Sequence, residues 1–143
     1  MTEPAIPEGY SPHFRKSPFT DPWEPLFSRT QAREVSIGLV LSQAHCNSRG
    51  LVHGGLIASL ADNAMGLSCM AALQEEGRGA PGGLVTITLG TDYLGPARIG
   101  QWLATDTHFV KTGGSICFAD CLLRADGVPV ARAGATFKVL QAG

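Results

Sequence analysis

The sequence predicts an α+β fold in which an antiparallel β-sheet wraps around one long central α-helix. The stretch after Gly50 repeats its apolar residues at helical spacing, whereas the segments on either side alternate apolar and polar residues, as strands do. Short glycine-containing connections between the later strands favour antiparallel neighbours. The chain has 143 residues, 44% of them hydrophobic, which suffices for one compact domain.

Residues 1–30 are expected to form a proline-rich lead-in segment that packs on the body, because six of the nine prolines lie there among scattered aromatic residues. One short helix is expected within it, near 19–28. Residues 31–143 are expected to form the domain. Its first strand begins at Glu34, where every second residue from Val35 to Leu41 is apolar.

The central helix is expected to start at His53-Gly54-Gly55 and to run for roughly five turns. Its apolar face is predicted to contain Leu56, Ile57, Leu60, Ala61, Ala64, Leu67, Ser68, Ala71 and Ala72. The opposite face is predicted to contain small residues around one acid, namely Ala58, Ser59, Asp62, Gly66 and Cys69. A solvent-exposed helix face usually carries Lys, Glu, Gln or Arg, so this one is predicted to meet a second copy of the chain.

Four glycines and a proline in the segment 75–83 end the helix. Four further strands are expected after it, at 84–94, 100–111, 115–125 and 128–140. The turns between them, GPARIG, TGG and ADG, are short enough to join antiparallel strands directly.

Composition argues against several classes of partner. Only 16% of the residues are charged and the net charge is −1, so nothing favours nucleic acid or an anionic membrane. No uninterrupted apolar run approaches the ~20 residues that span a bilayer. The residues after Met1 lack the basic start and apolar run of a secretory signal, which predicts a cytoplasmic protein. The four cysteines form no CxxC pair, so reduced thiols and no metal site are expected.

The spacing of His53-Gly54-Gly55 and Asp62 points to chemistry at a carbonyl group. Asp62 is the one formally charged residue between Leu51 and Gln74. Free N–H groups at a helix N-terminus can stabilise an oxyanion, and a carboxylate can activate water or attack directly. Asp62 lies about 13 Å along the helix from His53. If two helices pack antiparallel around a twofold axis, however, the Gly54 amide of one chain can face Asp62 of the other.

Asn47, His53-Gly54-Gly55 and Asp62, in this spacing, resemble the hotdog-fold acyl-CoA thioesterases of the phenylacetate-pathway (PaaI-like) type. The segments GTDYLGPARIG (90–100) and GVPVARAGATFKV (127–139) are also similar to that family, so the resemblance covers about residues 30–140. It implies the hotdog fold, in which the sheet wraps the long helix. It also implies a homodimer with a continuous sheet, commonly paired into a homotetramer, with active sites at the dimer interface.

The resemblance implies a role for each matching residue. Asp62 would act as general base or nucleophile, and the Gly54 amide would polarise the thioester. Asn47 and His53 would position the thioester end, and Thr86 would help to hold the attacking water. Coenzyme A, which is part of the substrate rather than a cofactor, is expected to contact Gly55, Lys111, Thr112, Gly113 and Ser115.

One residue departs from the family pattern. Gly114 stands where the family often has Arg or Lys. The nucleotide phosphates could then be held by Lys111, Arg98 or Arg132, or by the amides of the turn.

The predicted function is hydrolysis of an acyl-CoA thioester, with an aryl or short- to medium-chain acyl group, to the free acid and coenzyme A. The expected partners are this substrate and a second copy of the chain. Two alternatives stay open: an acyl-CoA-binding sensor without turnover, and a dehydratase of hydroxyacyl thioesters. A sensor usually needs an output module, which the sequence does not indicate. The HGG turn that opens the helix, with Asn47 upstream, resembles the hydrolases.

Overall fold

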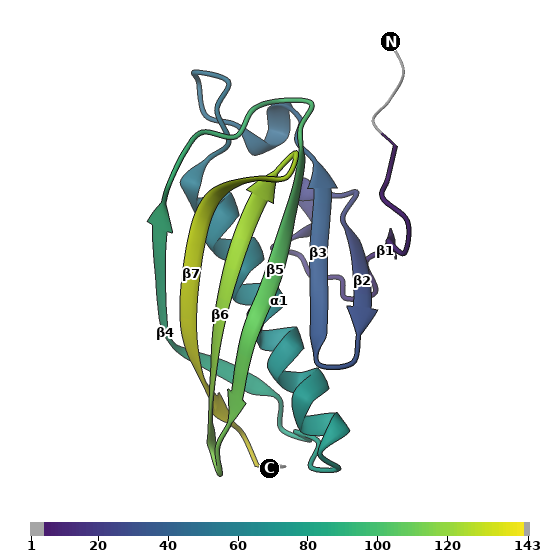
Figure 1. The fold of residues 1–143 in the computed structure, drawn as a ribbon, viewed down its shortest axis with the longest axis vertical. Coiled ribbons are helices and arrows are strands. Elements are labelled where there is room, and N and C mark those ends of the chain that lie inside the picture. Colours follow the sequence, from purple (N-terminus) through teal and green to yellow (C-terminus); the bar gives the residue numbers. More distant parts are fainter. Residues whose placement is uncertain (1–4, 142–143) are drawn as a thin grey trace.

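A computed structural model describes residues 5–141. One long helix, α1 (Gly54–Glu75), lies in the hollow of a seven-stranded sheet that curves around it (Figure 1). The strands are β1 (Ser11–Pro12), β2 (Phe27–Gln31), β3 (Glu34–Val40), β4 (Leu84–Tyr93), β5 (Trp102–Thr112), β6 (Ile116–Ala125) and β7 (Val128–Val139). They are all antiparallel to their neighbours, in the order β1-β2-β3-β5-β6-β7-β4. The predicted α+β architecture is confirmed.

The lead-in segment differs from the expected short helix near 19–28. Only a three-residue 3₁₀ helix, η1 (Asp21–Trp23), forms there, and Phe27–Gln31 is a strand paired with β3. Pro25 explains the difference, since proline restricts the residue before it to extended conformations, and Glu24 is extended with ψ 149°. The division into a lead-in segment, 1–30, and a domain, 31–143, stays a prediction, and its ends at 1–4 and 142–143 lie outside the described residues.

The buried stripe of α1 winds around the helix instead of keeping one angle. Near its start the predicted core residues Leu56, Ile57 and Leu60 are buried, but further along Leu67 and Ala71 are only half-buried. Met65, Cys69 and Leu73 are buried in their place. The assignment of Cys69 to the face opposite the core was therefore wrong. A helical wheel assumes a flat surface, whereas a twisted sheet covers a different angle at each turn of the helix.

The length and apolar composition of α1 would allow it to cross a membrane, with 22 residues and a mean hydropathy of 1.4. In this fold, α1 instead contacts β3, β4, β5, β6 and β7, as the core helix of a globular domain does. The η2 turn (Gln43–His45) precedes it.

Strand β4 forms one edge of the sheet. It pairs with β7 on one side, and no strand of residues 5–141 pairs with its other side. Val85, Ile87 and Leu89 are 46%, 52% and 39% exposed. An exposed apolar edge strand is a ready site for pairing with another chain.

Candidate active site

Asn47 shapes the turn that leads into α1. Its side-chain Oδ1 accepts hydrogen bonds from the N–H groups of Arg49 and Leu51, at 2.9 and 3.3 Å, and its own N–H donates to the Leu51 carbonyl. Gly50 completes the turn with φ +75°, a conformation that glycine adopts readily. Among residues 5–141, no acceptor binds the side-chain Nδ2 group of Asn47, so two N–H donors stay available for a ligand.

His53 caps the N-terminus of α1. Its Nδ1 accepts a hydrogen bond of 2.9 Å from the Gly55 N–H. A neutral imidazole that accepts at Nδ1 carries its hydrogen on Nε2. The exposed ring of His53 can therefore donate one hydrogen bond from Nε2, while its acceptor nitrogen is occupied.

Gly54 carries the free amide of this helix start. The N–H of Gly55 is bound by His53, and those of Leu56 and Ile57 donate to the His53 carbonyl. The Gly54 N–H has no acceptor within the described part of the chain. It lies at the positive end of a 22-residue helix, where an oxygen that gains negative charge is stabilised.

Tyr93 holds Gly54 in place, and no sequence pattern predicted this contact. The Tyr93 hydroxyl donates a hydrogen bond of 2.7 Å to the Gly54 carbonyl. A Cβ atom at position 54 would lie 3.1 Å from the Tyr93 ring, so a side chain there would crowd the tyrosine. The end of β4 thus fixes the peptide groups at the start of α1.

Asp62 and Thr86 meet between α1 and the edge strand. The Thr86 hydroxyl donates a hydrogen bond of 2.7 Å to Asp62 Oδ1. The pairing of β4 with β7 shifts by one residue between Thr86 and Thr88, and such a bulge re-aims the neighbouring side chains. Both residues line a cavity of about 360 Å³, together with Arg15 from the lead-in segment and Leu84 and Phe137 from the sheet.

The two groups of predicted catalytic residues do not come together within one chain. Asn47, His53 and Gly54 lie at the start of α1, and Asp62 lies eight residues further along, which is about 12 Å of helix. The structure joins Asp62 to Thr86 on one hand, and His53 to Gly55 on the other.

The turn predicted to contact coenzyme A lies at the far end of α1 from Gly55. The Thr112 hydroxyl donates to the Glu76 carboxylate at 2.7 Å, a bond that lowers the Glu76 pKa. Arg78, which was not among the predicted residues, donates to the carbonyls of Gly113 and Gly114 at 2.6 and 3.0 Å. A guanidinium group from the segment after the helix thus lies against the glycine where the family often has a basic residue.

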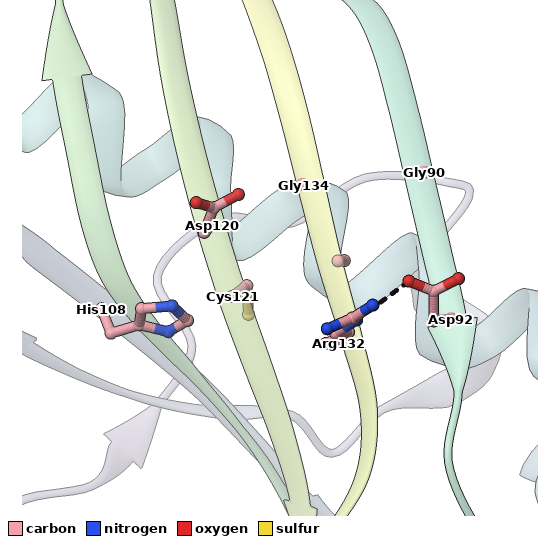
Figure 2. A pocket seen from close by; sticks show the side chains of 8 residues that line it. Gly90, Asp92, His108, Asp120, Cys121, Arg132 and Gly134 are labelled. Atoms are coloured by element: carbon pink, nitrogen blue, oxygen red, sulfur yellow. Dashed lines mark hydrogen bonds and ion pairs between the residues drawn. The ribbon is translucent and has the colours of Figure 1, made fainter.

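The remaining basic residues named for the phosphates lie elsewhere. Arg132 is on the face of the sheet that points away from α1, where it donates to Asp92 on the adjacent strand at 2.9 Å, and both residues line a hollow of about 340 Å³ (Figure 2). His108 and Asp120 line the same hollow. Lys111 lines a neighbouring cavity with Phe109 and Phe118. Arg98 pairs by a β-bridge with Leu51, near the start of α1.

The cysteines do not provide a nucleophile. Burial raises the pKa of Cys69 to about 12 and that of Cys121 to about 11, and it also raises the pKa of Cys46 and Cys117. Thiols with raised pKa values stay protonated near neutral pH. Within residues 5–141, no three His, Cys, Asp or Glu side chains gather as metal ligands would.

The sequence pattern of the thioesterase superfamily matches residues 49–131. A Pseudomonas aeruginosa protein named as a candidate esterase is 38% identical over 133 residues, which cover 92% of this chain and 96% of that protein. Human acyl-coenzyme A thioesterase 13 is 36% identical over 101 residues, covering 69% of this chain and 68% of the human protein.

Solved structures of similar fold include the Escherichia coli PaaI protein from the phenylacetic acid degradation operon. Its TM-score is 0.70 at 18% identity, with 82% of this chain and 80% of that one covered. A Streptococcus mutans protein bound to acetyl-CoA has a TM-score of 0.71 at 22% identity, covering 82% of this chain and 90% of that one.

Proposed function

Starting from the finding that this chain belongs to the thioesterase superfamily, we propose that it hydrolyses acyl-CoA thioesters to the free acid and coenzyme A, at a site built from two subunits. The superfamily match and the thioesterase and esterase relatives show a thioester hydrolase, and the expected likeness to PaaI proteins is confirmed for the fold. The proposal goes further in naming the catalytic residues, acyl-CoA as the substrate, and a dimer as the assembly that forms the site.

The observation that carries the proposal is the free N–H of Gly54 at the start of α1. A thioester carbonyl that accepts a hydrogen bond from this group becomes more electrophilic, and the oxyanion formed on attack is stabilised there. The Nε2–H of His53 and the side-chain amide of Asn47 are further donors near this N-terminus.

Asp62 is the proposed base or nucleophile. As base, it would take a proton from water while the water oxygen bonds to the carbonyl carbon; collapse of the oxyanion then breaks the C–S bond, and the proton passes to the leaving thiolate. As nucleophile, Asp62 would bond to the same carbon and release the thiolate, and water would hydrolyse the resulting anhydride. In either case the Thr86 hydroxyl orients the carboxylate.

A second copy of the chain brings the two groups together. About 12 Å separates Gly54 from Asp62 along one helix, which is too far for one carbonyl to contact both. The exposed apolar edge of β4 lies beside Asp62, since Thr86 belongs to this strand. We place the twofold axis at this edge, so that each dimer has two composite sites.

The face of the sheet that points away from α1 offers a surface through which two dimers could pair. Phe109 and Phe118 are each 46% exposed there, on β5 and β6. Aromatic residues are enriched in protein interfaces. A dimer of dimers built through this face is part of the proposal.

Coenzyme A is the proposed thiol portion of the substrate. Acyl-coenzyme A thioesterase 13 carries this substrate in its name, and the similar S. mutans structure contains acetyl-CoA. Arg78 supplies a cation at the Gly113–Gly114 turn, and guanidinium groups pair well with phosphates. We expect Arg78 to take the role of the basic residue that is missing at position 114.

The test is release of free thiol from a panel of acyl-CoAs, comprising phenylacetyl-CoA, hydroxybenzoyl-CoA and straight chains of two to twelve carbons. Asp62→Asn keeps the shape of the side chain and removes its basicity. We expect turnover by the wild type and a loss of at least about 10²-fold in kcat in this variant, with the oligomer unchanged by light scattering. Equal turnover by both proteins would exclude Asp62 as base or nucleophile, and no turnover of any thioester would refute hydrolysis.

A further inference from the structure

A second cavity lies at the start of α1, on the side of the lead-in segment. Its volume is about 370 Å³, within the range of small-molecule sites. The residues that line it include Phe19, Trp23, His45, His53, Gly55 and Leu56. Gly54, whose N–H is free, lies between two residues that line this cavity.

Two aromatic residues of the lead-in segment form one wall. The rings of Phe19 and Trp23 meet edge to face, with centroids 4.8 Å apart and planes at 74°. Trp23 also packs against the hydrophobic core, whereas the Phe19 side chain is 65% exposed. The partly buried tryptophan thus packs against a phenylalanine ring that is mostly exposed.

A chain of hydrogen bonds fixes this wall to the start of the helix. The ring of the buried His45 accepts at Nδ1 from the Ser42 N–H, so its Nε2–H donates to the Trp23 carbonyl at 3.0 Å. The His45 carbonyl in turn accepts from the His53 N–H at 2.9 Å. His45 therefore binds both the aromatic wall, through Trp23, and the cap of α1, through His53, and so fixes the distance between the two.

The lining of this cavity selects an uncharged occupant. Of the described residues, no Lys, Arg, Asp or Glu lines it, whereas the cavity at Asp62 includes both Asp62 and Arg15. Aromatic walls favour aromatic and bulky apolar groups, because ring edges and faces attract each other in addition to the apolar area they bury.

We infer that this cavity receives the acyl group of the substrate and that Phe19 is a specificity-determining residue favouring aryl over acetyl thioesters. This inference rests on the proposed function, because the Gly54 N–H must hold the thioester carbonyl. With the carbonyl there, the acyl group extends past Gly55 toward the ring of Phe19. The acyl-binding wall and the oxyanion donor then come from one subunit, and Asp62 comes from the other.

The experiment compares kcat/KM for phenylacetyl-CoA and acetyl-CoA in the wild type, Phe19→Ala and Phe14→Ala. Phe14 is a matched control, because it belongs to the same segment, is 61% exposed and does not line the cavity. In Phe19→Ala we expect kcat/KM for phenylacetyl-CoA to fall about tenfold and that for acetyl-CoA to change less than about twofold. Phe14→Ala should leave the ratio of the two substrates unchanged.

The outcomes separate this inference from the proposed function. The wild type could hydrolyse acyl-CoAs while Phe19→Ala lowers kcat/KM equally for both substrates, or changes it for neither. The specificity role of Phe19 would then be refuted, and hydrolysis would stand. A shift of the ratio in Phe14→Ala as large as that in Phe19→Ala would also refute it. If the wild type hydrolyses none of the panel, the proposed function fails and the inference fails with it.

Discussion

The Thr86 hydroxyl donates a hydrogen bond of 2.7 Å to Oδ1 of Asp62 and so joins the edge strand β4 to the central helix. A hydrogen bond to a carboxylate holds it in one orientation. A change in Thr86 should therefore alter catalysis without removing the acid itself.

Thr86→Val, which keeps the shape of the side chain and removes its hydroxyl, is expected to lower kcat/KM about 10- to 100-fold. The loss corresponds to one hydrogen bond to a charged group, worth about 1.5–3 kcal/mol. Thr86→Ser keeps the donor and should retain most of the activity. The readout is thiol release, and activity of Thr86→Val within about twofold of the wild type would show that this bond does not contribute.

Tyr93→Phe is expected to lower kcat/KM about 2- to 10-fold by removing the hydrogen bond to the Gly54 carbonyl, since such neutral bonds contribute about 0.5–1.5 kcal/mol. Tyr10→Phe is the control, because Tyr10 packs against Trp102 and not against the helix start. If both variants lose activity equally, Tyr93 acts through general stability and not through Gly54.

Mixing two inactive variants should restore activity if each site uses two chains. Gly54→Pro removes the proposed donor, because proline has no N–H, and proline is favoured at the first position of a helix. Gly54→Ala adds a similar Cβ and keeps the donor, which controls for crowding against Tyr93. In an exchanged mixture of Gly54→Pro and Asp62→Asn, half of the dimers are mixed, each with one intact site, so about a quarter of the wild-type activity is expected.

The mixing experiment measures thiol release before and after subunit exchange in mild denaturant. Activity that stays at the level of the separate variants, although mixed dimers are detected by mass spectrometry, would refute a site that combines Gly54 of one chain with Asp62 of the other.

His13 is expected to make stability depend on pH. It is 1% exposed and neither ring nitrogen has a hydrogen-bond partner among residues 5–141, and burial lowers its pKa in the folded protein below the usual value of 6.5. The charges near it act in both directions, since Glu24 favours the protonated form whereas Lys16 and Arg15 oppose it.

Because the folded pKa of His13 is the lower one, the unfolded chain binds more protons as the pH falls through and below 6.5. His13 therefore lowers stability there by at most about 1.4 kcal/mol per pH unit. The Tm should fall from pH 7.5 to pH 5, and less so in His13→Leu. His108→Gln, which changes an exposed histidine, is the control. An equal fall in the wild type and His13→Leu would exclude His13 as the cause.

Some features were predictable because they depend on neighbours in the sequence. The period of apolar residues predicted the strands from Glu34 onward and the central helix, and the position of His53-Gly54-Gly55 predicted a helix start with free N–H groups. Thr86 came from the family resemblance, since nothing in its local sequence distinguishes it from an ordinary strand residue. Its role, like those of the other site residues, stays a proposal.

Sequence alone could not predict the contacts that depend on how the sheet curves around the helix. The burial of Cys69 follows from the twist of the sheet, and the contact of Tyr93 with Gly54 joins residues 39 positions apart. Arg78 reaches the Gly113–Gly114 turn, and Phe19 reaches the helix start, only because the chain folds back on itself.

Local periodicity and a contiguous motif were enough to predict the elements from Glu34 onward, the family, and the spacing of Gly54 and Asp62 along one helix. Which side chains meet depends instead on how the chain folds. Strand register, a bulge beside Thr86 and the path of the lead-in segment fix those distances, and each of them results from packing forces between residues far apart in the chain.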